Sequence, residues 1–258
     1  MNQESSMYSS EFVERYQELE NRFRQKVEED RRIWKSSRYI PNMPPKNKVD
    51  FLFIGMEPSL GWWAKTPEKA EEKIAQGFKN FLFSINDFIL HYCVREYLCH
   101  PSEYYITDLS KGAMLTKDAQ IQRKERYESW YSLFCQEFDI VSKNTTKAVA
   151  IGKKPYKFLK DMSFQGNLQR ILHYSSQANR YRQNIAKNNP QKFEKFAHEV
   201  SAKSLFTKAT EVLNDSRMSQ ELIIDTLKRL KSKSELTESQ KHLIGKFFYP
   251  KNMKFHFS

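Results

Sequence analysis

Apolar residues gather in four short runs along the chain, and these runs predict four β-strands. They are VDFLFIG at 49–55, EYYITDL at 103–109, KAVAIG at 147–152 and the shorter LQRILHYSS at 168–176. The first three are separated by roughly 30–50 residues of mainly helical pattern, which is typical of parallel strands joined by helical crossovers. We therefore expect an α/β fold with three layers, α/β/α, around a central, mostly parallel four-stranded sheet.

The segments before and between the strands carry helical patterns. Residues 9–36 repeat apolar side chains at three- and four-residue spacing, which predicts a long amphipathic helix. The repeating positions are Phe12, Tyr16, Leu19, Phe23 and Val27. The proline-rich stretch YIPNMPPKNK ends this pattern and leads into the first strand. Residues 66–98 also read as helical, with a break near Gly77.

Three parts follow from these patterns. Residues 1–46 form an N-terminal amphipathic helix and linker, and residues 47–187 form the α/β core. Residues 188–258 read as a basic helical extension, packed on or beside the core, with 13 basic and eight acidic side chains. Within it Thr237 and Gln240 have the spacing of a capping box, in which each side chain bonds the other's backbone N–H.

Composition supports a folded, water-soluble protein. Of the 258 residues 39% are hydrophobic, enough for a real core, and 29% are charged. No apolar run approaches the roughly 20 residues that span a bilayer. The first residues, MNQESSMYSSEF, lack the charged start and apolar core of a signal peptide. We therefore expect a cytoplasmic location and no membrane partner.

The three cysteines, Cys93, Cys99 and Cys135, are odd in number and lack the paired spacing of metal ligands. This pattern favours reduced, buried thiols over disulfides or an iron-sulfur cluster. We expect neither a metal nor any other cofactor.

Positive charge is concentrated in one segment of the chain. The net charge is +12, and residues 143–187 hold ten Lys or Arg but a single acid, Asp161. Aromatic residues stand among these charges, namely Tyr156, Phe158, Phe164, Tyr174 and Tyr181. Phosphate neutralisation combined with base stacking needs this mixture, so the segment predicts a nucleic-acid surface. A solvated basic face is the alternative.

The predicted strands end in residues that can do chemistry. In parallel sheets, functional groups gather beyond the carboxyl ends of the strands, where Glu57, Asp108, Gly152 and His173 fall. The Gly-Lys-Lys turn at Gly152 lacks the frame of a nucleotide-hydrolysing phosphate loop. Its backbone N–H groups and lysines suit a contact with a DNA phosphate better.

These strand ends resemble, in order, the motifs of the uracil-DNA glycosylase superfamily. FLFIGMEPS is similar to its first motif, in which a strand is followed by Gly, a variable residue, a polar catalytic residue and Pro. YYITDLSK resembles the strand ending in Thr-Asn, and KAVAIGKKPY the apolar strand with a glycine turn. ILHYSSQANRYR resembles the strand that leads to His-Pro-Ser and a DNA-inserting loop. The chain departs from the family at Glu57 (usually Asp or Asn), Asp108 (Asn) and Tyr174 (Pro).

The resemblance implies a DNA glycosylase that flips a pyrimidine-type base and hydrolyses its glycosidic bond, leaving an abasic site. Such a reaction needs an anion near the sugar cation and a donor at the leaving base. Glu57 is the expected anion and His173 the expected donor. The expected base-recognition residues are Asp108, Phe81, Phe83, Met56, Trp62 and Trp63. The expected DNA-binding residues are Ser59, Lys111, Lys153, Lys154, Gln177, Arg180, Tyr181 and Arg182.

Asp108 points away from uracil. An Asn side chain both donates and accepts, whereas an ionised Asp only accepts, which suits the exocyclic amine of a cytosine-type base. Removal of plain cytosine would destroy the cell's own genome. The long segment after Glu57, with Trp62 and Trp63, can shape a larger pocket. We therefore expect a modified cytosine as substrate, as in some bacteriophage DNA, and a role in antiviral defence.

Other interpretations stay open. Glu57 and Asp108 can be helix-capping carboxylates, His173 a structural histidine, and the two tryptophans packing residues. The chain can also be a uracil or damaged-base repair glycosylase, or a nucleic-acid-binding protein without catalysis. A metal-dependent nuclease using Glu57 and Asp108 is a weaker alternative. DNA is the expected partner, with an abasic-site endonuclease acting downstream, and the oligomeric state is left open.

Overall fold

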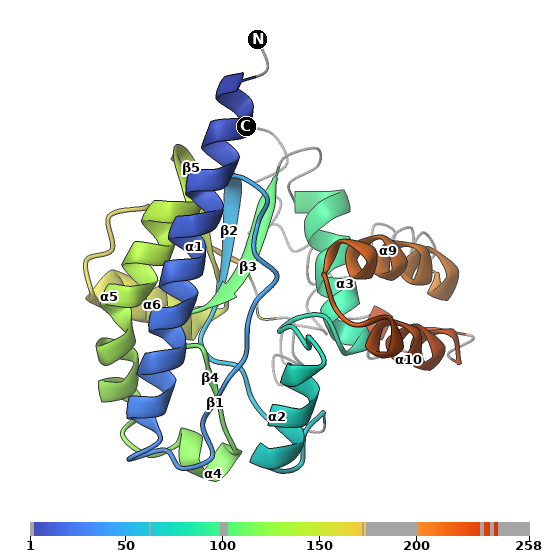
Figure 1. Ribbon diagram of the computed structural model, residues 1–258, viewed down its shortest axis with the longest axis horizontal. Coiled ribbons are helices and arrows are strands. Elements are labelled where there is room, and N and C mark those ends of the chain that lie inside the picture. The colour runs from blue at the N-terminus through green and yellow to red at the C-terminus, as the bar shows by residue number, and fades with distance from the viewer. Residues whose placement is uncertain are drawn as a thin grey trace, which may run out of the picture. The chain divides into compact units, whose positions relative to one another are not determined.

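The computed structural model of the chain describes residues 3–61, 63–98, 103–171, 173, 201–232, 235–237 and 240–241 (Figure 1). Its elements in chain order are α1 (Gln3–Asp30), β1 (Arg38–Tyr39), β2 (Val49–Gly55), α2 (Pro67–Ala75), α3 (Ile85–Cys93), the π-helical turn η1 (Val94–Leu98), β3 (Tyr104–Asp108), β4 (Gly112–Ala113), α4 (Thr116–Ala119), α5 (Arg123–Val141), β5 (Ser142–Ile151), α6 (Lys153–Asp161), β6 (Asn167–Ile171), α9 (Ala202–Asp215) and α10 (Gln220–Lys231).

The central sheet confirms the predicted fold class. It is a parallel sheet of four strands in the order β3-β2-β5-β6, flanked by helices in an α/β/α arrangement. β2 and β3 pair in parallel with Gly55 opposite Asp108, so the residues that follow both strands lie at one edge of the sheet. β2 is buried along almost its whole length, as expected for a strand covered on both faces. A small antiparallel sheet of β1 and β4 was not predicted.

Contacts divide the chain into two compact units. The first comprises residues 1–80 and 103–148, and the second residues 81–102 and 149–258. β5 passes from one unit into the other between Ala148 and Val149. The predicted division into residues 1–46, 47–187 and 188–258 instead cuts the chain into three consecutive segments. That division stays a prediction.

In the first unit α1 and α5 lie side by side (Figure 1). The Phe23 and Trp130 rings are 6.0 Å apart, and the Trp130 indole N–H donates to Asp30 at 2.6 Å. The buried side of α1 carries the apolar repeat found in the sequence, but the helix ends at Asp30 rather than near residue 36. It ends there because the chain turns inward to bury Trp34, whose indole N–H donates to the Ile121 carbonyl at 2.8 Å.

Among the described residues, the second unit contains α3, η1, α6, β6, α9, α10 and the end of β5. Ser84 and Asp87 form a capping box at the start of α3, and α9 packs against both α3 and α10. The capping box predicted between Thr237 and Gln240 is confirmed. The Thr237 N–H donates to the Gln240 side chain at 2.8 Å, and the Gln240 N–H donates to the Thr237 hydroxyl at 3.3 Å.

The structure also bears on the predictions for residues 66–98, the cysteines and membrane-spanning helices. The helical segment 66–98 contains α2, α3 and η1, and Gly77, with φ at 89°, breaks it as expected. Cys93 and Cys135 are free thiols, and burial raises the pKa of Cys93 well above its ordinary value. Cys99 lies outside the described residues. Among the described helices, none combines the length and the apolar character needed to cross a membrane.

Candidate functional site

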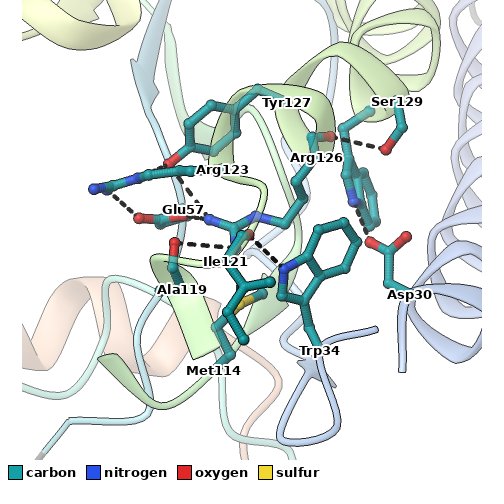
Figure 2. Close-up of polar contacts among 11 residues, drawn as sticks. Asp30, Trp34, Glu57, Met114, Ala119, Ile121, Arg123, Arg126, Tyr127 and Ser129 are labelled. Carbon is teal, nitrogen blue, oxygen red and sulfur yellow. Dashed lines mark hydrogen bonds and ion pairs between the residues drawn. The ribbon is translucent and has the colours of Figure 1, made fainter. Parts of the chain in front are cut away.

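The carboxylate of Glu57 lies between two arginine side chains (Figure 2). One of its oxygens accepts a hydrogen bond from the guanidinium of Arg123, and the other accepts one from Arg126. Both arginines come from the first turns of α5, and Glu57 follows the end of β2. Its side chain is 11% exposed. Glu57 is therefore an almost buried anion with two cationic partners.

Arg126 is held on every side by protein. Its side chain is 0% exposed, and one guanidinium nitrogen lies 3.0 Å from the Met114 sulfur. The rings of Trp34 and Tyr127 lie 5.5 and 5.1 Å from its guanidinium carbon. Burial lowers the pKa of Arg126. The Glu57 carboxylate is the anion bonded to its guanidinium.

Arg123 is held more loosely. Its side chain is 30% exposed, and its Nε donates to the hydroxyl of Tyr127 at 2.7 Å. Burial raises the pKa of Tyr127, so this hydroxyl stays protonated at neutral pH and can accept the bond. Arg123 therefore reaches both the Glu57 carboxylate and the solvent.

Asp108 ends β3 as a buried carboxylate. One of its oxygens accepts a hydrogen bond from the side-chain amide of Asn80 at 2.8 Å. Backbone bonds continue beyond the paired strands, from the Leu109 N–H to the Gly55 carbonyl at 3.2 Å and from the Ser110 N–H to the Met56 carbonyl at 3.1 Å. These bonds hold the segment that leads from β2 to Glu57 beside the segment that follows Asp108.

Gly55 leaves the space that the Asp108 carboxylate occupies. A β-carbon at Gly55 would collide with Asp108 Oδ1. We expect Gly55→Ala to push this carboxylate away from Asn80 and to cost about 1–3 kcal/mol of stability, since the strand cannot move freely in a packed sheet. Urea denaturation measures the loss. The double variant Gly55→Ala/Asp108→Ala removes the collision and should be more stable than Gly55→Ala alone. Equal stability of the two variants would contradict this explanation.

A buried polar network lies behind Asp108. The ammonium of Lys111 donates to the Asp108 carbonyl and to Glu137, both at 2.6 Å, and also to Thr107. Glu137 in turn accepts from Tyr105 at 2.8 Å and from Thr107 at 3.1 Å. The side chain of Lys111 is 2% exposed. The predicted DNA contact of Lys111 is corrected here, because its ammonium is directed into the protein, where no phosphate can reach it.

Three further predicted residues of the first unit lie near β2. Met56 is half-buried, and Ser59 is exposed and forms a parallel β-bridge with Met114. Trp63 stacks on Phe78 with ring centres 4.2 Å apart, and its indole N–H donates to the Ser59 carbonyl at 2.7 Å. Trp63 therefore packs against Phe78, and its part in a base pocket stays a prediction. Trp62 lies outside the described residues.

The predicted stacking residues belong to the second unit. Phe81 is buried and has φ at 62°, a region that bulky residues rarely adopt. The Phe83 ring is covered by the guanidinium of Arg229 from α10, whose central carbon lies 3.7 Å from the ring centre. A base could stack on that face of Phe83 only after Arg229 had moved.

The predicted phosphate-contact and donor residues of this unit lie where β5 and β6 end. Lys153 and Lys154 are exposed at the start of α6. Gly152, with φ at 100°, lets His173 approach, since a β-carbon there would lie 3.1 Å from the His173 β-carbon. His173 is exposed. The predicted DNA-inserting residues Gln177, Arg180, Tyr181 and Arg182 lie outside the described residues.

Sequence reasoning missed four residues of this site: Asn80, Arg123, Arg126 and Tyr127. None of them directly follows a predicted strand, and the sequence motifs placed the expected chemistry at the strand ends. The charged run RKERY at 123–127 was the available signal, because its arginines are three positions apart and share one face of a helix.

No protein family, no curated protein and no solved structure matches this chain. Neither Glu57 nor Asp108 caps the start of a helix within the described ranges, so the capping alternative fails there. In the same ranges, no three Asp, Glu, His or Cys residues are grouped to hold a metal ion. The two guanidinium groups beside Glu57 would also repel a cation.

Proposed function

We propose that this chain is a DNA glycosylase that removes an amine-bearing pyrimidine, a modified cytosine, and leaves an abasic site. The observation that carries the proposal is the pair of carboxylates, Glu57 and Asp108, at the carboxyl ends of two adjacent parallel strands. The two carboxylates have different partners, guanidinium groups for Glu57 and an amide for Asp108. Two fixed acids in different surroundings suit two different tasks.

Glu57 suits the task of the catalytic anion. Cleavage of a glycosidic bond develops positive charge on the sugar, and a fixed carboxylate stabilises that charge or orients the attacking water. The arginines hold Glu57 in one position, so its orientation needs no rearrangement during the reaction. They also offset part of its charge, which favours water orientation over direct charge stabilisation.

Asp108 suits recognition of a base that displaces the groups covering it, since the residue is 3% exposed. An ionised carboxylate offers acceptors only, and an exocyclic amine on cytosine is a donor. The amide of Asn80 fixes the orientation of the carboxylate. Catalysis in the cytoplasm, a donor role for His173 and action against phage DNA are further parts of the proposal and rest on the sequence.

Release of the free base tests the proposal most directly. The purified chain is incubated with DNA that contains uracil, cytosine, hydroxymethylcytosine or glucosylated cytosine, and the released bases are identified by mass spectrometry. We expect release from a modified cytosine and retention of plain cytosine. Release of uracil alone would favour a repair glycosylase. No release from any of these DNAs or from phage genomes would overturn the proposal.

We expect Asp108→Asn to shift the base preference toward uracil. An Asn side chain can donate to a carbonyl of uracil as well as accept, so selectivity should change by roughly 10-fold to 100-fold. The measurement compares cleavage of matched duplexes that differ in the target base. Asp50→Asn is the control, because Asp50 is partly exposed and pairs with Lys143 outside the site. Unchanged selectivity in Asp108→Asn would show that Asp108 does not read the base.

A nucleic-acid-binding protein without catalysis is the second candidate. The double pairing of Glu57 favours it, because a carboxylate with two cationic partners also has a purely structural explanation. Such a protein would bind the same DNAs without releasing a base. Binding and base release must therefore be measured on the same samples.

A further inference from the structure

The Glu57 carboxylate has two guanidinium partners, one at each oxygen. If one arginine turned away, the other would still pair with it. The nearby Asp108 carboxylate is buried and has a bond from Asn80. Its charge acts on Tyr127, where it contributes to the raised pKa of that hydroxyl. The charges of Arg123 and Arg126 act on the same tyrosine, so Asp108 adds a second negative charge to this cluster.

The two arginines differ in how they can respond to a ligand. Arg126 is enclosed by the Trp34 and Tyr127 rings and the Met114 sulfur, so it stays with Glu57. Arg123 is 30% exposed, and Glu57 would keep Arg126 as its partner without it. Only Arg123 can therefore turn part of its guanidinium toward a group arriving from solvent.

The local backbone adds to the attraction for an anion. Arg123 is the first residue of α5, a helix of 19 residues that begins without a side-chain cap. The first N–H groups of such a helix carry partial positive charge, which strengthens the field of the arginine beside them. The planar guanidinium can donate two parallel hydrogen bonds to a phosphate while its Nε keeps the Tyr127 hydroxyl.

We propose that Arg123 binds a phosphate group of a nucleic-acid backbone, and that Glu57 holds its guanidinium in position until that phosphate arrives. When the phosphate binds, Arg123 shares its donors with it, and Glu57 keeps Arg126 as its partner. Glu57 then carries less compensated charge. If the proposed glycosylase function holds, on which this last step rests, nucleic-acid binding thereby prepares Glu57 as the catalytic anion.

Substitution of Arg123 gives the first test. The probe is a fluorescent double-stranded oligodeoxynucleotide without modified bases, and anisotropy gives its dissociation constant over a range of NaCl concentrations. We expect Arg123→Gln to weaken binding about tenfold and to reduce the slope of log affinity against log salt by about one. Arg123→Lys keeps the charge but loses the planar pair of donors. Its affinity should lie between those of Arg123→Gln and the unaltered protein.

Lys124→Gln is the matched control. It removes the same charge from the next residue, whose side chain is 80% exposed and paired with Glu128 at 3.4 Å. We expect binding within twofold of the unaltered protein. Equal losses in Arg123→Gln and Lys124→Gln would mean that only overall charge matters, and that result would overturn the proposal. Thermal melting of each variant shows whether it is folded.

A second test concerns the role of Glu57. Glu57→Gln keeps the shape of the side chain but removes the competing charge, so its affinity for the oligodeoxynucleotide should rise severalfold. Unchanged or weaker binding by a folded Glu57→Gln variant would overturn the role of Glu57 as a placeholder. Inorganic phosphate alone should raise the melting temperature of the unaltered protein more than that of Arg123→Gln. Such a rise without Arg123-dependent binding of the oligodeoxynucleotide would indicate a site for free phosphate instead of the nucleic-acid backbone.

These binding measurements do not depend on catalysis. Arg123-dependent binding without release of any base would leave the phosphate site intact and contradict the glycosylase function. Base release that does not change in Arg123→Gln, together with unchanged binding, would contradict the phosphate site alone.

Discussion

Glu57→Ala is expected to lower the free energy of unfolding by about 3–5 kcal/mol and to abolish base release. The stability loss follows from Arg126, whose wholly buried guanidinium would lose its carboxylate partner. The loss of base release follows from the proposed role of Glu57. Chemical denaturation and the base-release assay, made on the same preparation, check the two parts separately.

A variant pair separates stability from chemistry. Glu57→Leu/Arg126→Met replaces both charges by apolar side chains, and such a replacement often restores much of the stability lost when one partner is removed. We expect this double variant to be more stable than Glu57→Ala yet inactive. Base release by the stable double variant would remove Glu57 from the catalytic role. A stability of Glu57→Ala equal to that of the unaltered protein would show that the ion pair contributes nothing.

Lys111→Met is expected to destabilise the first unit by a similar amount, about 3–5 kcal/mol, because it leaves the Glu137 carboxylate buried without its cation. Glu137→Leu should do the same to Lys111. Tyr105 donates a hydrogen bond to Glu137, but a tyrosine cannot supply the lost positive charge. Denaturation midpoints in urea give the losses.

The double variant Lys111→Met/Glu137→Leu provides the contrast. With both charges removed, we expect a loss smaller than that of either single variant. Lys143→Met is the matched surface control, since its ion pair with Asp50 is partly exposed and should contribute less than about 1 kcal/mol. Additive losses in the double variant would mean that Lys111 and Glu137 do not act as a pair.

Strands were the part of the fold best predicted from sequence. β2 occupies the run VDFLFIG, and β3 lies within EYYITDL. Both are short, apolar and bounded by Pro or Gly, and burial on both faces makes such a run distinct. β5 begins earlier than predicted, at Ser142, because its first residues are polar and partly exposed.

α5 shows why the rest of the site was missed. Hydrophobic periodicity finds a helix by its apolar buried face, but the buried face of α5 includes Arg126 and Glu137 as well as Trp130 and Phe134. The charges that weaken the pattern are the partners of Glu57 and Lys111. Sequence reasoning named the acids at the strand ends, but their counterions come from a distant segment, and no local pattern links the two.

The position of α5 also has a consequence for local opening of the protein. Within its length, α5 contacts Glu57 through Arg126, Asp30 through Trp130, and Lys111 through Glu137. Unfolding of the helix from Arg126 to Glu137 would break all three connections and leave charged groups buried without partners. Hydrogen exchange at the amides of α5 therefore has to proceed mainly through opening of the whole first unit, so that the candidate site and the core beneath it form one cooperative unit.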